Sequence, residues 1–596
     1  MVTGTEGLPA GRAGAVPAPE AKVGTPVLVL LVWLAGASAC LLLLLGSRLT
    51  FLLDDWEFLV YRSGLSADTV LRPHGEHIVV LPVLIYKALQ ATFGMGSALP
   101  YRVVSTALFV LSALLFFAYA KQRVGQWPAL AATAVILFLG AAWEDLLWSF
   151  QIVYFGSMAA GIGALLALER DSRRGDLLAC ALLVVAILFS SLGLPFAIGA
   201  AVAVLLRPDR WRAAYVFLVP AAVYAIWWLG WGHEAESSVT IKHIAETPVY
   251  ALDGLASSLS SALGLYKNDL AGTAEASGWS RALAVAVIGL AGSRLYLMKR
   301  VPPWFWVTLA IGASFWILAG FNQVPGRQPE VSRYQYVGVV FLFLVAADLL
   351  AGEIDLGRRL DFKILVPLAV LATISVASNV QNLLDAYDDD YHPVSQLEKA
   401  DLGAMEIARD TVEPNFALEE SVADTGFVHV EAGPWFDAVD RYGSPAWGGA
   451  EIAAAPPFAR FAADKVLFGA LRMGLEPLPA GALGAHAIEP PRWVLSGKAV
   501  ALGPGCMQLP EGIERLPLFV LTGGGGVRLR AGNVAIDRIE LARFASGDEY
   551  PIQIKGLVPG EAGFISIPRD RSRELWKLRL QGGAGAVVCG GTGESS

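Results

Sequence analysis

The stretch FLLDDWEF, residues 51–58, follows closely on the first long apolar run of the chain, residues 26–45. A run of about 20 apolar residues is long enough to cross the hydrocarbon core of a bilayer. Asp54 and Asp55 therefore lie where a first membrane span ends. Ionisable side chains at that depth are costly unless they are used or solvated. The pair indicates either a chemical site or a solvated helix end with Trp56 as interfacial anchor, and both interpretations stay open.

The composition of the 596-residue chain favours a membrane domain. Hydrophobic residues make up 55% of it and charged residues only 16%, whereas charged residues are about 25% of an average soluble chain. A mean hydropathy of +0.53 excludes a disordered chain. The net charge of −8 argues against nucleic acid as a partner, because such proteins carry basic surfaces. Four cysteines are too few for a fold built on disulfides.

Ten further apolar runs follow the first, so we predict an α-helical membrane protein with 11 spans. They lie at residues 102–120, 128–143, 150–168, 176–191, 194–206, 213–231, 281–298, 303–321, 334–352 and 363–380. The runs 176–191 and 194–206 are short, and Gly193 and Pro195 lie at their junction.

The orientation is predicted from the basic loops. With the N-terminus in the cytoplasm, every predicted inner loop carries Lys or Arg, as the positive-inside rule requires. These residues are Lys121, Arg123, Arg170, Arg173, Arg174, Arg207, Arg210, Arg212, Lys299, Arg300, Arg358 and Arg359. The apolar stretch 78–93 then lies on the outer surface as an amphipathic segment. Residues 1–25 are expected to be a disordered cytoplasmic tail, and everything after about residue 381 lies outside the cell membrane.

The extracytoplasmic tail is predicted to have two parts. Residues 381–492 form an acidic mixed region, with 16 acidic and 3 basic side chains between 381 and 451 and an expected helix at 399–412. Residues 493–596 carry short β-like runs separated by Gly-rich turns, which predicts an antiparallel β-sandwich. Cys506 and Cys589 flank these runs, and in an oxidising compartment they could form a disulfide.

A second polar cluster lies in the first outer loop. The stretch RPHGEH, residues 72–77, precedes the predicted surface segment. His74, Glu76 and His77 could bind a metal or orient a catalytic carboxylate. The His-x-x-His spacing is loose, so a hydrogen-bonding role beside the Asp pair is favoured, with Arg72 as a further candidate.

Two more outer loops carry candidate residues. The stretch WEDLLWSFQ, residues 143–151, ends at Gln151 and is either part of a site or an aromatic belt with solvated acids. Arg327 and Arg333 lie outside against the positive-inside trend, which suggests an anionic ligand such as a lipid phosphate. A structural pairing with Glu330 is the alternative. Lys267, in the outer loop 232–280, is a weaker candidate for the same task.

This arrangement resembles the GT-C superfamily of glycosyltransferases, which includes protein O-mannosyltransferases, aminoarabinose transferases and actinobacterial arabinosyl- and mannosyltransferases. The matching features are the acidic pair Asp54-Asp55, Glu76 later in that loop, and a late outer loop with arginines. The likeness covers most of residues 26–380, the expected membrane domain. An amphipathic surface segment and a C-terminal extracytoplasmic domain complete it.

The resemblance implies a sugar transferred from a polyprenyl-phosphate donor to a cell-envelope glycan or glycoprotein by inverting displacement. A carboxylate would act as general base. Asp55 is preferred over Asp54, because Trp56 should hold that turn at the interface. Arg333 or Arg327 would stabilise the leaving phosphate. Some members of the superfamily need a divalent metal and others do not, and the sequence leaves that choice open.

A non-enzymatic membrane protein is the competing hypothesis: a carrier or flippase of envelope lipids, or a scaffold with a carbohydrate-binding tail. A carrier should have charges deep in its spans and broken helices related by an internal repeat. Here the charges concentrate in outer loops and no repeat is found, which favours the enzyme.

Overall fold

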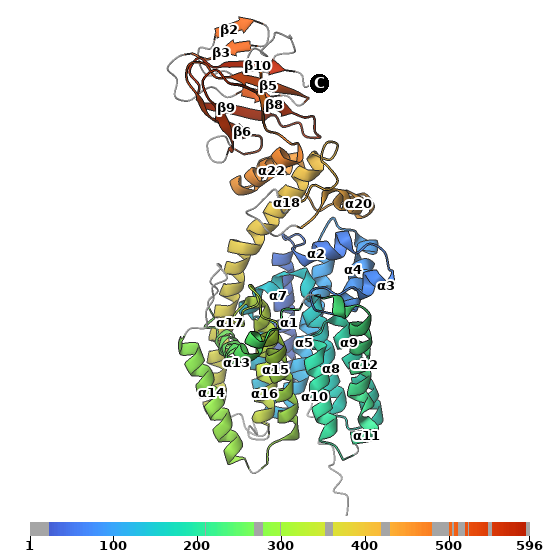
Figure 1. Cartoon of the computed structure of the whole chain (residues 1–596). Coiled ribbons are helices and arrows are strands. Elements are labelled where there is room, and N and C mark those ends of the chain that lie inside the picture. Colours follow the sequence, from blue (N-terminus) through green and yellow to red (C-terminus); the bar gives the residue numbers. More distant parts are fainter. Residues whose placement is uncertain are drawn as a thin grey trace, which may run out of the picture.

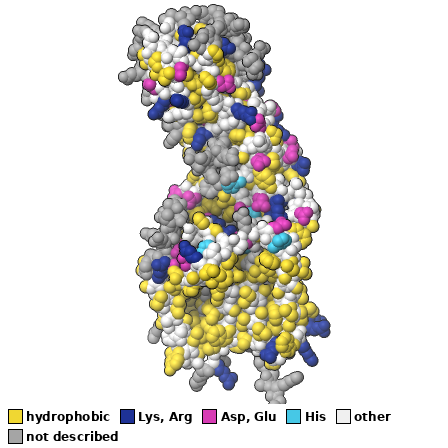
Figure 2. All heavy atoms as spheres, viewed as in Figure 1, with side chains coloured by type: hydrophobic (Ala, Val, Ile, Leu, Met, Phe, Trp, Pro, Cys, Tyr) yellow, Lys and Arg dark blue, Asp and Glu magenta, His cyan; other side chains and the backbone are white. Residues whose placement is uncertain are grey.

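The computed structural model describes residues 23–591 except 209, 236, 267–277, 299, 352–361, 419–428, 480–499, 504–505, 511–518, 522–523 and 546–550. Each of the eleven predicted apolar runs forms a helix in it. These helices are α1 (Thr25–Gly46), α5 (Leu99–Val124), α6 (Gln126–Leu137), α8 (Ile152–Leu168), α9 (Arg173–Phe189), α10 (Gly193–Leu205), α12 (Tyr215–Gly230), α14 (Gly278–Leu297), α15 (Pro303–Phe321), α16 (Ser332–Leu349) and α17 (Phe362–Ala386). Figure 2 shows a broad hydrophobic surface on the visible face of this bundle, with Lys and Arg side chains below it.

Nine helices of the described residues are long and apolar enough to cross a membrane, so the predicted count of 11 spans is approximate. The difference lies in α9 and α10, which have 17 and 13 residues. At about 1.5 Å per residue, α10 is only about 20 Å long, shorter than a bilayer core of about 30 Å. The two helices turn sharply onto each other, and a Cβ atom at Gly193 would lie 2.5 Å from the Ile187 backbone nitrogen.

Short elements connect the membrane helices. They are α2 (Asp54–Trp56), the π-helix η1 (Glu57–Tyr61), α3 (Ala67–Leu71), α4 (Val80–Phe93), η2 (Gly140–Ala142), α7 (Trp143–Leu147), η3 (Ser149–Gln151), α11 (Arg210–Ala213) and η4 (Gly232–Glu234). A further long helix, α13 (Ile241–Ala262), has 22 residues and packs against α14, α15 and α16. The predicted surface segment corresponds to α4, a helix of 14 residues. It packs against α5, α9 and η1.

The last membrane helix continues beyond the bundle. From α17 the chain runs through the π-helix η5 (Tyr387–Tyr391) directly into α18 (His392–Ile407). Helix α18 leads toward the C-terminal sheets (Figure 1). The helix expected at 399–412 is therefore the end of a longer one. Among the described residues of the tail, α18 is followed by the helices α20 (Ala432–Tyr442), α21 (Gly449–Ala454) and α22 (Pro457–Ala470).

The C-terminal region is the predicted β-sandwich, with two antiparallel sheets of strand orders β1-β8-β5-β10-β3-β2 and β4-β9-β6-β7. Its strands are β1 (Leu475–Leu478), β2 (Val500–Gly503), β3 (Cys506–Gln508), β4 (Phe519–Leu521), β5 (Gly525–Arg530), β6 (Ile536–Ala542), β7 (Ile552–Leu557), β8 (Ala562–Ile567), β9 (Trp576–Gly582) and β10 (Val587–Gly591). Strand β1 precedes residue 493 and pairs with β8. The strand expected at 493–495 lies outside the described residues.

The sandwich is fixed to the helical part of the tail by polar contacts. Asp464 of α22 is fully buried and accepts hydrogen bonds from three successive backbone N–H groups, those of residues 543–545, at 2.8–3.0 Å. Arg571 pairs with Asp410 at 2.6 Å, and its backbone N–H donates to the Ile407 carbonyl at the end of α18. The sheets are thereby held against α18 and α22.

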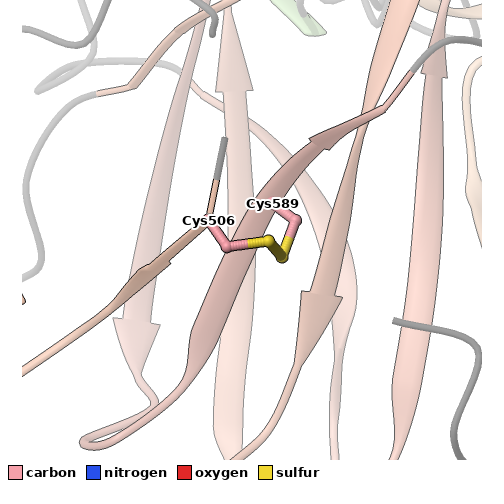
Figure 3. The surroundings of a disulfide bond; sticks show 2 residues. All are labelled: Cys506 and Cys589. Carbon is pink, nitrogen blue, oxygen red and sulfur yellow. A yellow bond between two sulfur atoms is a disulfide. The ribbon is translucent and has the colours of Figure 1, made fainter. Parts of the chain in front are cut away.

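Cys506 and Cys589 are joined by a disulfide, with their Cα atoms 4.1 Å apart (Figure 3). The two cysteines face each other on the neighbouring strands β3 and β10. The bond closes a loop that spans most of the sandwich, since the cysteines are 83 residues apart.

We expect the protein isolated without reductant to carry no free thiol at these two positions. The double variant Cys506→Ser/Cys589→Ser should be less stable, because loss of a native disulfide from a small secreted domain typically costs about 2–5 kcal/mol. Mass spectrometry after alkylation, with and without prior reduction, measures the first outcome, and thermal unfolding measures the second. Alkylation of both thiols in unreduced protein would contradict the bond.

Candidate functional site

A cavity of about 640 Å³ opens among the loops that join the membrane helices on the side of the C-terminal region. Its polar lining comes from several stretches of the chain that are far apart in sequence. These polar residues include Asp54, His74, Glu76, His77, Gln151, Asn322, Arg327 and Arg333. Apolar side chains of the membrane helices form another part of the wall, among them Leu194, Trp228, Phe315, Leu318 and Phe321. A ligand with a charged head and an apolar tail would match both parts.

The two neighbouring aspartates have different environments. Asp54 lines the cavity, and its side chain is 41% exposed. Asp55 is fully buried, and its carboxylate accepts hydrogen bonds from the Leu52 backbone N–H at 3.0 Å and the Ser149 hydroxyl at 2.9 Å. The Tyr86 hydroxyl donates a third. Burial raises the pKa of Asp55 to about 6 despite these bonds.

The preference for Asp55 over Asp54 as the reacting carboxylate stays a prediction, and in this geometry Asp54 and not Asp55 lines the cavity. The three hydrogen bonds of Asp55 hold α2 to the protein interior. The backbone at Leu53, with φ +49°, turns the chain directly before the pair. A left-handed conformation at a residue other than glycine stores strain of about 1–3 kcal/mol and is typical of functional sites.

The His-x-x-His stretch forms a tight turn at the cavity. His74 and His77 exchange backbone hydrogen bonds of 3.1 and 3.0 Å, and Gly75 between them has φ +51°, a conformation that suits glycine. The His74 ring lies between two carboxylates, with Nε2 3.1 Å from Asp54 and Nδ1 2.7 Å from Glu57. Burial would lower the pKa of His74, but the hydrogen bonds to both carboxylates raise it to about 9.

Glu57 and Arg62 belong to this cluster although the sequence analysis did not select them. Arg62 is buried and pairs with Glu57 at 3.0 Å. It also donates to the backbone carbonyls of Arg72 and Pro73, each at 2.9 Å, directly before His74. A signal for Glu57 was present, because residues three apart share a helical face, and Glu57 is three residues after Asp54.

Arg72 contacts Glu57 and does not line the cavity formed by the described residues. Its side chain is 47% exposed and contacts Glu57 at 3.4 Å, and Arg72 is absent from the described residues that line the cavity. The prediction that Arg72 binds substrate is therefore not supported by its placement. Lys267, the weaker candidate, lies outside the described residues.

Glu76 connects the loop before α4 to the loop after α15. Its carboxylate accepts a 2.5 Å hydrogen bond from Asn322 and pairs with Arg327. The Tyr250 hydroxyl donates to the Arg327 carbonyl at 2.8 Å and so holds the same loop. Burial would raise the pKa of Glu76, but the positive charges of His77 and Arg327 lower it. Glu76 is thus held as a carboxylate within an ion pair at the cavity.

Arg333 stands at the first turn of α16 and is clasped by the WEDLL stretch. Its backbone N–H and its Nε donate to Glu144 at 2.9 and 3.3 Å. Ser332 strengthens the clasp, since its hydroxyl donates to the Ala141 carbonyl at 2.8 Å and accepts from the Glu144 N–H at 3.1 Å. Arg333 is therefore paired with Glu144 and Arg327 with Glu76. The alternative expected from the sequence was a pairing with Glu330.

Two polar groups at the cavity have unused hydrogen-bonding capacity. Gln151 is only 3% exposed, and its Oε1 has no hydrogen-bond partner among the described residues. The Nδ1 atom of His77 is likewise buried without a partner in that part of the chain. Since unpaired buried polar groups are costly, both atoms suit a hydroxyl-bearing ligand.

A metal site is not assembled by the described residues. No three His, Cys, Asp or Glu side chains among them are arranged to hold a metal ion. Asp54 and Glu57 both face the His74 ring and do not converge on a common centre. We therefore derive no step that involves a divalent metal.

An acidic pair directly after the first membrane helix, the short helix α4, cavity-lining arginines late in the membrane domain and a C-terminal β-sheet region occur together here. No protein-family model matches the chain, and no curated protein matches it by sequence.

Two solved structures are similar in overall arrangement. One is ArnT from Cupriavidus metallidurans bound to undecaprenyl phosphate, with 12% identity and a TM-score of 0.42 over 66% of this chain and 82% of that one. The other is the arabinosyltransferase EmbB from Mycobacterium smegmatis, with 10% identity and a TM-score of 0.33 over 98% of this chain and 66% of that one.

Proposed function

We propose that the chain is a membrane glycosyltransferase that moves a sugar from a polyprenyl-phosphate donor to a cell-envelope acceptor. The observation that carries this proposal is the cavity, where the carboxylate of Asp54 and the guanidinium groups of Arg327 and Arg333 line one space beside apolar membrane helices. A lipid phosphate has the matching combination of a charged head and an apolar tail. Arg suits phosphate because its planar fork presents paired N–H donors.

The reaction is an inverting displacement at the anomeric carbon. The acceptor hydroxyl attacks that carbon, and Asp54 takes its proton as the new C–O bond forms. The bond between the anomeric carbon and the phosphate oxygen breaks, and its electron pair leaves with the polyprenyl phosphate. Arg333 and Arg327 stabilise the charge on the leaving phosphate, so it needs no proton. Gln151 and His77 are available to hydrogen-bond the sugar.

Purified protein supplied with a labelled polyprenyl-phosphate sugar tests the proposal. We expect release of polyprenyl phosphate together with a labelled product when envelope glycan is added as acceptor. Movement of the intact donor between leaflets of proteoliposomes, without cleavage of the sugar-phosphate bond, would contradict the enzyme hypothesis and support the carrier hypothesis.

We further propose that the N-terminus is cytoplasmic and the cavity lies on the outer face. The motive is the basic character of every predicted inner loop. The test uses single cysteines at Gln122, exposed in the last turn of α5, and at Lys242, whose side chain is 77% exposed, in protein whose free Cys40 and Cys180 are replaced by Ala. An impermeant maleimide should label position 242 in intact cells and position 122 only after permeabilisation. The reverse pattern would invert the orientation.

A further inference from the structure

A chain of contacts leads from the cavity to an ion pair with a buried arginine, which the proposed reaction does not yet use. Asp54 contacts the Nε2 atom of His74, and Nδ1 of the same ring contacts Glu57 at 2.7 Å. Glu57 in turn pairs with Arg62, whose side chain is fully buried. Asp54 and Glu57 are three residues apart on the continuous helical turns of α2 and η1. Both side chains therefore lie on the helical face that contacts the His74 ring.

We propose that Glu57, held by Arg62, is a positioning residue that fixes the His74 ring and through it the carboxylate of Asp54. The inference rests on the proposed role of Asp54 as the base. It deepens that proposal by naming what aims the reacting carboxylate.

The chemistry of the ring explains why a negative charge is needed at position 57. Neutral imidazole has one N–H and one acceptor nitrogen, so it can donate to only one carboxylate. Imidazolium has two N–H groups and can donate to Asp54 and Glu57 together. Glu57 thus keeps the second proton on His74, and the Nε2–H group fixes one oxygen of Asp54 while the other is left for the acceptor hydroxyl.

Arg62 makes the same assembly rigid on its other side. It donates to the carbonyls of Arg72 and Pro73, so the ion pair with Glu57 also fixes the backbone that leads into His74. The rings of Phe58 and Phe150 pack on His74 with centroids 5.4 and 4.9 Å away. Ring and backbone are therefore restrained together, as positioning of a reacting group requires.

The charged and titratable groups around the ring come from two loop segments. Those in direct contact or next to a contacting group are Asp54, Glu57, Arg62, Arg72, Glu76 and His77. Glu57→Gln removes the negative charge and keeps the shape, so the pKa of His74 should fall from about 9 toward its ordinary value. That ordinary value is about 6.5.

The test compares Glu57→Gln with wild type at pH 8 and pH 6. At pH 8 the variant ring is mostly neutral, and kcat should fall by about 10-fold to 100-fold with the donor KM unchanged. At pH 6 the ring regains its proton and most of the loss should disappear. Loss of the same size at both pH values would point to a structural role and would overturn the proposal. Glu246→Gln, which changes an exposed ion pair on α13, is the matched control and should behave as wild type.

A double-mutant cycle separates this inference from the proposed function. If Glu57 acts through Asp54, adding Glu57→Gln to Asp54→Asn should lower kcat no further. If Asp54→Asn alone leaves transfer intact, the base assignment fails and this inference fails with it. If Asp54→Asn abolishes transfer while Glu57→Gln equals wild type at both pH values, only this inference fails.

His74→Asn covers the case in which Glu57→Gln does not fold. It leaves the ion pair of Glu57 with Arg62 in place and removes the ring. The expected result is the same loss of kcat without recovery at pH 6. Wild-type turnover in this variant at both pH values would overturn the proposal.

Discussion

Asp54→Asn should slow sugar transfer by about 10²–10⁴-fold, the usual contribution of a general base. The substitution keeps the size of the side chain at the cavity and removes its ability to take a proton. Because Asp54 is 41% exposed and has no part in the buried network around Asp55, folded protein and donor binding should be unchanged. The measurement is transfer of labelled sugar from a polyprenyl-phosphate donor at matched amounts of folded protein.

Asp55→Asn is the matched control, since it makes the same change one residue away. Its three hydrogen-bond donors are arranged for a carboxylate, and an amide would leave one of them unpaired. We expect a loss of stability of about 1–3 kcal/mol, seen as a lower unfolding temperature. If Asp55→Asn abolished transfer at full stability while Asp54→Asn stayed within tenfold of wild type, the roles of the two residues would have to be exchanged.

Arg333→Ala should weaken donor binding by about 10-fold to 100-fold, as expected for a hydrogen bond to a charged group worth about 1.5–3 kcal/mol. Arg333→Lys should restore only part of the affinity, because an ammonium group cannot make the paired contact of a guanidinium. Binding of a fluorescent polyprenyl-phosphate analogue measures both variants.

Arg472→Ala is the control for that experiment. Arg472 pairs with Glu413 in the tail, and its side chain is 69% exposed, so its removal should leave donor binding unchanged. Equal affinities of wild type and Arg333→Ala would remove Arg333 from the donor site. A strong loss in Arg327→Ala alone would transfer the role to Arg327.

The membrane helices were predictable because hydropathy is a local property of the sequence. All eleven apolar runs are helices. The helices α9 and α10 are not counted as spans because they have only 17 and 13 residues. The close approach at Gly193 that joins them is not visible in either run alone. The β-sandwich was predicted in the same local way from short β-like runs and Gly-rich turns. The disulfide was predicted from the two cysteines that flank these runs.

The candidate site was harder to predict, since its decisive features are directional. The residue types of the cavity were selected from the sequence, among them Asp54, Glu76 and Arg333. Which of two adjacent aspartates faces the cavity depends on the backbone at Leu53, which the residue names do not reveal. Arg62 was missed because its partners are carbonyls that come close only after the loop has folded.

The helix is uninterrupted from α17 through η5 into α18, so the tail is joined to the membrane domain by a rigid helical axis and not by a flexible linker. Its lower part is anchored at the membrane domain, where the Ser395 hydroxyl accepts from the Thr50 N–H at 2.8 Å and Glu398 accepts from Trp56 at 3.2 Å. An α-helix turns about 100° and rises about 1.5 Å per residue. One residue inserted between 399 and 407 would therefore swing the sandwich about 100° around this axis, whereas four would turn it only about 40° and lift it about 6 Å. Length variation in this segment therefore changes mainly the rotation of the C-terminal domain about the helix axis, and changes its distance along that axis only slightly.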